Sequence, residues 1–277
     1  MLVDADSAQV YRDLKILSAG PSDDELARAE HRLYGILDGA RPCSAADWAV
    51  LARREIEDIH ASDRLPILVG GTGLYLRTLL DGIAPIPTID AEIRRTVRES
   101  DVETNQKRLK SADPESFARL KPSDKTRIAR ALEVVLSTGR TLAEWQQERE
   151  DGIGNQVELR PLILLPPRPW LHERCDARFA EMMEHGAVEE VRALLSRDLD
   201  PALPVMRAIG VREIAAYVRG EIDRAEAIAL GQQATRQYAK RQYTWFKHQP
   251  PPEWPRFELP LEQDTISTAL ELLSASA

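Results

Sequence analysis

The pattern of hydrophobic and polar positions predicts an α/β chain. Short apolar runs alternate with longer segments whose apolar residues recur at helical spacing, as in the strand–helix–strand units of parallel sheets with right-handed crossovers. Glycine, proline or polar residues end each run. The segments that we interpret as strands are 1–5, 31–39, 65–69 and 160–167, and we expect the last of them to return the chain to the sheet.

Helix starts are recognisable from a capping residue followed by acids, at 22–25 and again at 44–47. The second start leads into apolar residues at near-helical spacing, so it predicts the crossover helix before the third strand. Gly186 is a position at which a long amphipathic helix can split. The later helices that we predict cover 169–196, the two segments containing 207–212 and 236–247, and a weakly helical end at 265–273.

A basic helical region interrupts the α/β pattern. Pro85 and Pro87 predict a stiff, extended connection into it. The helical segments that follow are 90–100, 105–111, 114–120 and 123–138, the last with a capping Ser-Asp and a terminal glycine. We therefore interpret 89–154 as a helical insertion domain, and 1–88 with 155–277 as the α/β core.

Polar chemistry is concentrated where the first strand ends, in the stretch Asp6-Ser7-Ala8-Gln9-Val10-Tyr11. In open α/β sheets ligands collect outside the carboxyl ends of strands. An acid, a hydroxyl and an amide at that place can accept a proton, bind an oxygen and contact the edge of a base. Taken alone, the segment favours the simpler interpretation, in which Asp6 and Ser7 only cap a loop or a helix.

A second motif, Gly70-Gly71-Thr72-Gly73, follows the third predicted strand. Glycines let a backbone approach a ligand closely, and the amides at the start of the next helix favour an anion. Many α/β turns contain paired glycines, so this motif is weak by itself. The sequence also carries further basic motifs at 127–134, 206–214 and 234–242, the last running into 244–246.

In this order and spacing, the five stretches resemble the tRNA dimethylallyltransferases of the bacterial type, over essentially the whole chain. The resemblance implies a P-loop-NTPase-like parallel sheet flanked by helices, with an insertion domain that closes over the anticodon loop. It also implies transfer of a dimethylallyl group from dimethylallyl diphosphate to the exocyclic amine of the adenosine 3′-adjacent to the anticodon. The expected partners are the tRNA anticodon stem-loop and the diphosphate donor, with Mg²⁺ as cofactor.

The proposed reaction assigns roles to individual residues. The amine must lose a proton, and Asp6 is the expected base, as the resemblance also implies. Gln9 can contact an adenine edge because its amide both donates and accepts, and Arg212 is the expected holder of the departing diphosphate. For each arginine the competing interpretation is a surface ion pair. The full set of expected site residues is Asp6, Thr72 and Arg212 for catalysis, and Asp6, Ser7, Ala8, Gln9, Thr72, Arg127, Arg130, Arg207, Arg212, Lys240 and Arg241 for tRNA binding.

Two departures from the family pattern change what we expect of the activity. A phosphate-binding loop of the form Gly-x-x-x-x-Gly-Lys-Ser/Thr is absent from the sequence, and Gly20 stands where the family usually has a lysine. Such a loop would hold the diphosphate with its amides and lysine. We therefore expect the 277-residue chain to bind the prenyl donor poorly. We expect the missing strand and loop to be encoded upstream of Met1, or else lost from a decayed gene copy.

Charge and cysteine content set further limits. The net charge of −8 argues against nucleic-acid binding by bulk charge. Positive charge is instead concentrated locally, with twelve Lys/Arg against seven Asp/Glu over 94–140 and four basic residues without an acid over 236–247. The competing interpretation of each segment is an ordinary solvated helix face. Two isolated cysteines and the lack of an apolar run of membrane-spanning length predict a cytoplasmic protein, which we expect to be a monomer.

Three alternatives remain open from the sequence. A small-molecule kinase of the same architecture would not need the adenine site or the carboxyl-terminal basic helix. A prenyltransferase acting on free AMP would also have no use for the basic insertion. A non-catalytic tRNA-binding remnant would explain the missing glycine loop. A prenylation assay on unmodified tRNA separates the remnant from the enzyme.

Overall fold

The computed structural model describes residues 1–275, and the chain divides into two compact units. One comprises Met1–Leu79 and Gln156–Ala277, and the other comprises Leu80–Asn155. The predicted insertion, 89–154, lies within the second unit.

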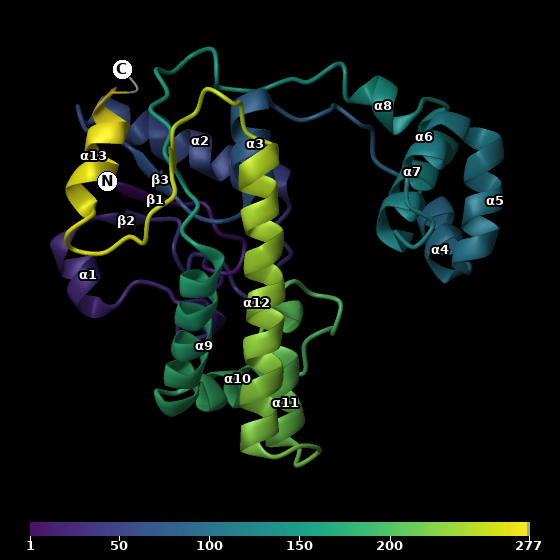
Figure 1. The fold of residues 1–277 in the computed structure, drawn as a ribbon. Helices are drawn as coiled ribbons and strands as arrows, with labels where there is room; N and C mark the ends of the chain where they lie inside the picture. Colours follow the sequence, from purple (N-terminus) through teal and green to yellow (C-terminus); the bar gives the residue numbers. More distant parts are fainter. Residues whose placement is uncertain (276–277) are drawn as a thin grey trace. The chain divides into compact units, whose positions relative to one another are not determined.

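The larger unit is built on a parallel sheet in which β1 (Leu2–Asp4) lies between β2 (His31–Arg32) and β3 (Ile67–Val69). Leu2 is paired with a residue of each neighbour. Residues 3–5 at the end of the central strand are fully buried. Helices flank these strands (Figure 1), so the predicted α/β class, with a parallel sheet in the manner of P-loop NTPases, is confirmed.

Both predicted helix starts are confirmed, because each forms a complete capping box. In α1 (Asp23–Arg28) the Ser22 side chain accepts from the backbone of Glu25, whose carboxylate accepts from the backbone of Ser22. Ser44 and the third residue of α2 (Ala45–Ala61) make the same reciprocal pair. These bonds satisfy donors that the first helical turn otherwise leaves free.

Two predicted strands are shorter or paired differently from the expectation. The run 31–39 forms only a two-residue strand, because Leu33 and Gly35 have positive φ angles of 69° and 60°, which end the extended conformation. The run 160–167 contributes β4 (Ile163–Leu164), which pairs with β5 (Arg256–Phe257) in a separate parallel sheet. The prediction that this run joins the first sheet is therefore wrong for the described residues. Prolines on both sides of β4 lack a backbone donor, and this keeps the strand short.

The predicted long helix splits at Gly186, whose φ is 108°, a conformation that favours glycine. The first part packs alongside the long α12 (Arg224–His248) (Figure 1), whereas the second part packs on α11 (Val211–Val218). The helices of this unit lie close to their predicted positions. After α2 they are α3 (Gly73–Asp81), α9 (Arg168–Glu184), α10 (Ala187–Leu195), α11 (Val211–Val218), α12 (Arg224–His248) and α13 (Ile266–Ala275). Short 3-10 turns lie at Arg12–Leu14 and Val205–Arg207.

The smaller unit is helical. Its helices are α4 (Ala91–Glu99), α5 (Val102–Ala112), α6 (Pro114–Arg119), α7 (Lys125–Thr138) and α8 (Leu142–Trp145). Val97, Leu109, Ile128 and Leu132 are almost fully buried in its core. Helices occupy the four segments in which the sequence predicts them, whereas α8 is an addition.

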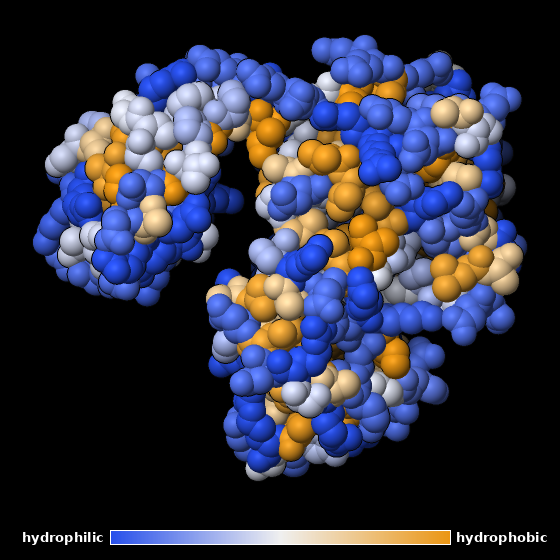
Figure 2. Space-filling model, turned by 180° about the vertical axis from the view of Figure 1, so that it is seen from behind, coloured by the Kyte–Doolittle hydropathy of each residue, from blue (hydrophilic) through white to orange (hydrophobic). Residues whose placement is uncertain are grey.

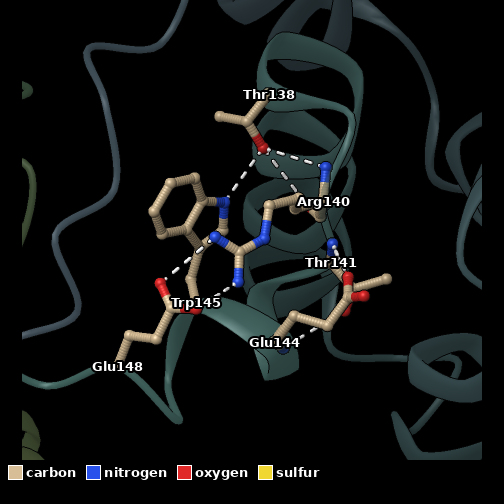
Figure 3. A network of polar contacts seen from close by, with 6 residues as sticks. All are labelled: Thr138, Arg140, Thr141, Glu144, Trp145 and Glu148. Carbon is tan, nitrogen blue, oxygen red and sulfur yellow. Dashed lines mark hydrogen bonds and ion pairs between the residues drawn. The ribbon is translucent and has the colours of Figure 1, made fainter.

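The turn from α7 to α8 is held by a polar network (Figure 3). The guanidinium of Arg140 lies 4.3 Å from the ring of Trp145 and forms an ion pair of 2.8 Å with Glu148. The Trp145 indole N–H donates to the Thr138 hydroxyl over 3.0 Å. Because the turn leaves α7 through Gly139, at a φ of 72°, this network replaces the contacts that a continuing helix would have made.

Apolar side chains gather on the surface of the larger unit (Figure 2). Exposed members at the edge of the parallel sheet include Leu65, Ile67 and Val69, and Leu164 in β4 is also exposed. Within the described residues, β3 pairs only with β1 and β4 pairs only with β5, so each is an edge strand. None of the described helices combines the length and the apolar character that a membrane crossing requires.

Candidate active site

The two loops that follow β1 and β3 are joined by hydrogen bonds. The backbone N–H of Ser7 donates to Thr72 Oγ1 over 2.9 Å, and the Thr72 hydroxyl donates to Ser7 Oγ over 3.2 Å. The backbone N–H of Thr72 donates to the carbonyl of Ala5 over 3.1 Å. The structure therefore brings together two motifs that lie 65 residues apart in the sequence. They meet at the carboxyl ends of adjacent parallel strands, where α/β folds bind ligands.

The Asp6 carboxylate is oriented by its own loop. Its Oδ1 accepts the backbone N–H of Ala8 over 2.8 Å, so the capping role that the sequence left open is present. Within the described residues, Oδ2 takes part in no hydrogen bond. Asp6 is half-buried. It therefore has one oxygen that fixes its direction and another that remains for a ligand.

The glycine turn allows the close packing of this site. A Cβ on Gly70 would lie 2.3 Å from the backbone of Ala5, and one on Gly73 would lie 2.3 Å from the ring of Trp245 in α12. Gln242, one turn earlier in the same helix, donates from Nε2 to the carbonyl of Gly71 over 2.9 Å. The glycines are required here because Cβ atoms would displace both the Asp6 loop and α12.

Tyr238 is a site residue that the sequence analysis missed. The side chains of Thr72 and Gln242 lie near its hydroxyl. Burial raises the pKa of Tyr238, and the nearby Asp6 carboxylate raises it further. The available signal was its position four residues before Gln242, which places both side chains on one face of α12. The phenol therefore stays neutral at neutral pH beside the proposed base.

Gln9 is turned away from the role expected of it. Its Nε2 donates to the carbonyls of Ser18 and Ala19, over 3.0 and 2.8 Å. Both amide hydrogens are therefore occupied by the following turn, and only Oε1 is left to accept from a base. The bidentate contact predicted for Gln9 needs one N–H together with Oε1, so it would require at least one of these two bonds to break.

The basic residues expected at the site are spread along three elements of the larger unit. Arg207 ends a 3-10 turn, and Arg212, in the first turn of α11, is exposed. Arg212 lines a hollow of about 460 Å³ between α11 and α12, together with Gln233 and Gln237. No hydrogen bond or ion pair joins Arg212 to the Asp6 loop within the described residues.

The basic face of α12 lies closer to the proposed base. The guanidinium of Arg241 lies 5.4 Å from the ring centre of Tyr238, so it reaches toward the side chain beside Asp6. Lys240 is exposed. Arg236, counted in the same basic segment, is instead paired with Asp176 of α9. Part of the charge on this helix is therefore structural, as the ion-pair interpretation anticipates.

In the smaller unit, Arg130 is half-buried and lies 3.8 Å from Glu133, which is only 1% exposed and also binds Arg98. Burial lowers the pKa of Arg130, while Glu133 opposes that change. Arg127 is 76% exposed and pairs with Asp124 over 3.5 Å. The buried carboxylate thus holds two guanidinium groups at the surface, whereas Arg127 has only a weak surface ion pair.

The donor set of the site does not amount to a metal centre. Asp6 is the carboxylate of the two loops that faces the site, and the hydroxyls of Ser7 and Thr72 are bonded to each other. Within the described residues, no three side chains of His, Cys, Asp or Glu come together as a metal site would require. The expected Mg²⁺ thus has no protein cage among these residues.

Comparison with known proteins decides the family. The sequence model described as IPP transferase matches residues 9–249, most of the chain. The chain belongs to the IPP transferase family. It is similar to a tRNA dimethylallyltransferase of Erythrobacter litoralis, 61% identical over 258 residues that cover 93% of this chain and 81% of the relative. A tRNA dimethylallyltransferase of Novosphingobium aromaticivorans is 60% identical over 269 residues, covering 97% and 96%.

Solved structures agree with this assignment. The tRNA isopentenylpyrophosphate transferase of Bacillus halodurans matches with a TM-score of 0.67 at 28% identity, over 99% of this chain and 88% of that one. A eukaryotic dimethylallyltransferase acting on tRNA matches with a TM-score of 0.82 at 24% identity, over 99% and 71%. The second likeness supports the fold alone.

Proposed function

We propose that this chain is a tRNA dimethylallyltransferase. It transfers a dimethylallyl group from dimethylallyl diphosphate to the exocyclic amine of the adenosine 3′-adjacent to the anticodon. The observation that carries the proposal is the Asp6 carboxylate, held at the carboxyl end of β1 with one oxygen bound to the Ala8 N–H and the other left for a substrate proton. The named relatives support the same reaction.

The reaction requires one bond to form and one to break. The amine nitrogen of adenine attacks the first carbon of the dimethylallyl group, and the bond from that carbon to the diphosphate oxygen breaks with its electron pair leaving on the diphosphate. The nitrogen then carries one proton too many, and Asp6 accepts it. Ser7 and Thr72 support this step because their mutual bonds hold the Asp6 loop against the glycine turn.

Substrate binding divides between the remaining residues. The adenine must leave the base stack to reach Asp6. Its pocket is proposed to include Ser7, Ala8, Oε1 of Gln9 and the neutral Tyr238. Arg212 is proposed to hold the departing diphosphate, since a guanidinium binds phosphate oxygens in a fork. Mg²⁺ enters this proposal only as a counter-ion of the diphosphate, with no protein ligand assigned.

The tRNA backbone is proposed to bind basic side chains of both units. In the larger unit these are Arg207, Lys240 and Arg241, and in the helical unit they are Arg127 and Arg130. Glu133 pre-orients Arg130, which lowers the entropy lost on binding a phosphate. The helical unit is therefore proposed as a contact for the anticodon stem-loop. We further propose that the protein acts as a monomer in the cytoplasm, where its two free cysteines stay reduced.

The test is a transfer assay on unmodified tRNA with dimethylallyl diphosphate, followed by digestion and mass detection of isopentenyladenosine. Because the sequence contains no Gly-x-x-x-x-Gly-Lys-Ser/Thr loop to hold the donor, we expect a low yield of product even at high donor concentration. We expect that yield to depend on Asp6, with Asp23→Asn as the control because Asp23 is an exposed acid paired with Lys15. AMP replaces tRNA in a parallel reaction. Prenylation of AMP but not of tRNA would contradict the proposed substrate, and tRNA binding without any product would leave only the non-catalytic alternative.

A further inference from the structure

A second acid, Asp4, is buried directly behind the proposed base. Its side chain is fully buried, with an exposed fraction of 0%. Its Oδ1 accepts the backbone N–H of Asp6 over 2.8 Å, whereas its Oδ2 has no hydrogen-bond partner. Trp48 of α2 donates its indole N–H to the Asp4 carbonyl over 3.0 Å, so the backbone at this point is fixed as well.

Within the described part of the chain, no positively charged group acts on Asp4. The titratable groups that face it are Asp6 on its own loop, Tyr34 after β2 and Tyr75 of α3. The Tyr75 ring stacks on the Trp48 ring with ring centres 4.7 Å apart, so aromatic rings line this side of the Asp4 environment. Burial raises the pKa of Asp4 from 3.8 to about 8; the Asp6 N–H opposes this rise and the Asp6 charge adds to it. Asp4 is therefore a neutral carboxylic acid at neutral pH.

We propose that Asp4 is a positioning residue for prenyl transfer, whose buried side chain fixes the direction in which Asp6 presents its carboxylate. The inference rests on the proposed function of Asp6 as base. Two consecutive hydrogen bonds make the connection: Asp4 Oδ1 accepts the Asp6 N–H, and Asp6 Oδ1 accepts the Ala8 N–H. Loss of the first hydrogen bond removes the restraint on the backbone that carries the base.

Asp4 is compatible with a base at Asp6 because Asp4 itself is neutral. A charged Asp4 would place a second negative charge beside Asp6 in a site without a counter-ion, and its unpaired Oδ2 would have to reach water. The acid proton belongs on Oδ2, because Oδ1 already accepts a hydrogen bond. As Asp4 ionises, we expect the Asp6 loop to open and the turnover to fall.

Two substitutions at Asp4 separate these effects. Asp4→Asn keeps the acceptor oxygen and the neutral state, so we expect kcat close to that of the wild type at neutral pH. Asp4→Ala removes the acceptor, so we expect kcat to fall between about tenfold and about 10²-fold, the range for a misplaced catalytic group. The affinity for tRNA should change less than about twofold, because Asp4 touches no surface that tRNA can reach.

Asp113 provides a matched control. It is 1% exposed, its Oδ1 accepts the backbone N–H of Ser116 over 2.9 Å, and its Oδ2 is also without a partner. Asp113 lies in the helical unit and not at the Asp6 loop. Asp113→Ala should therefore lower thermal stability as Asp4→Ala does, but leave kcat at saturating tRNA unchanged. Equal losses of kcat in both variants would overturn the positioning role.

The pH profile gives a readout that does not depend on Asp4→Ala folding. The wild type should lose turnover on the alkaline side with a midpoint near the pKa of Asp4, about 8, and Asp4→Asn should lack that limb. The same alkaline limb in Asp4→Asn would overturn the proposal. Turnover of Asp4→Asn as low as that of Asp4→Ala at neutral pH would overturn it too, since the neutral acceptor would then not suffice.

Amide hydrogen exchange tests the contact without any activity. The Asp6 N–H should exchange about tenfold faster in Asp4→Ala, the factor for a hydrogen bond of about 1.4 kcal/mol, and at the wild-type rate in Asp4→Asn. Unchanged exchange in Asp4→Ala would contradict the proposal. A wild-type chain that never prenylates tRNA would contradict the proposed function, and the exchange rates would still decide whether Asp4 holds the loop.

Discussion

At the scale of single residues, the site depends on two acids in different environments. Asp6 is half-buried and faces the site, whereas Asp4 is fully buried among aromatic rings. Two acids in different surroundings can take different roles. In our proposal the half-buried acid takes a proton, and the fully buried one supports it.

The first prediction concerns Asp6. Asp6→Asn keeps the size of the side chain and an oxygen for the Ala8 N–H, but removes the base. We expect turnover to fall by about 10²–10⁴-fold, the usual contribution of a general base, with tRNA affinity nearly unchanged. Turnover, tRNA affinity and melting temperature should be measured on the same protein.

The other two outcomes have distinct signatures. A purely structural cap would lower the melting temperature, at a cost of about 1 kcal/mol, and leave turnover near normal at low temperature. A binding residue would raise the apparent substrate constant and leave kcat alone. Either result would remove Asp6 from the chemistry.

At the scale of elements, α12 connects the core of the larger unit to the proposed RNA surface. Its first half packs on α9, where Gly231 meets Phe179, and its second half carries Tyr238 and Gln242 to the glycine turn. One helix therefore serves packing, the site and the basic surface. Gly231, Tyr238 and Gln242 lie on one side of the helix at successive levels along it, whereas Lys240 lies on the opposite side. Packing, site and basic surface can therefore be changed one at a time.

Gly231→Ala tests the packing face. Alanine gains about 1 kcal/mol of helix propensity over glycine. The new Cβ would nevertheless lie 2.0 Å from the Phe179 ring, and overpacking of this kind costs about 1–3 kcal/mol. We expect a lower melting temperature, with recovery in Gly231→Ala/Phe179→Leu and little change in Gln233→Ala, an exposed position of the same helix. A higher melting temperature for Gly231→Ala would show that α9 and α12 can move apart at this point without loss of stability.

The basic face is tested by replacing Lys240 and Arg241 with alanine together. We expect weaker tRNA binding and a salt dependence that is flatter by about two units, one for each lost phosphate contact. The control is Arg192→Ala, an exposed arginine of α10 that is paired with Glu189. Binding should be measured over a series of salt concentrations. An unchanged slope in the double variant would exclude this face as the RNA contact.

At the scale of the whole molecule, burial of an acid without a counter-ion makes stability depend on pH. The pKa of Asp4 is raised on folding, from 3.8 to about 8. A raised pKa means that the folded chain binds the proton more tightly than the unfolded chain. The resulting stability is fully present below pH 3.8 and is lost as the pH rises to about 8.

We therefore predict that the wild type loses stability relative to Asp4→Asn between about pH 5 and about pH 8, by on the order of 4 kcal/mol. Denaturant unfolding of both proteins across this range measures the difference, in which the titrations common to both cancel. Glu190, whose pKa is also raised by burial, acts with the same sign in both proteins. Parallel pH profiles would mean that Asp4 is already charged in the folded chain.

The features that the sequence predicts well are local. The caps at Ser22 and Ser44 need only a partner three residues away, and the break at Gly186 needs only its own backbone angle. The Asp6 loop and the glycine turn are also recognisable, because a strand that ends in polar or glycine residues has few alternatives. The contacts between these segments cannot be predicted in this way.

Tertiary structure decided the rest, because the deciding contacts join residues far apart in the chain. Tyr238 comes to the site only when α12 reaches the glycine turn, and β4 finds its partner, β5, only far along the chain. The sequence by itself indicated the Asp6 loop and the glycine turn, the two segments that we propose as the site, through short-range patterns. Burial then determined their states: it left Asp6 open to a substrate, while it closed Asp4 off from water and so kept that acid neutral.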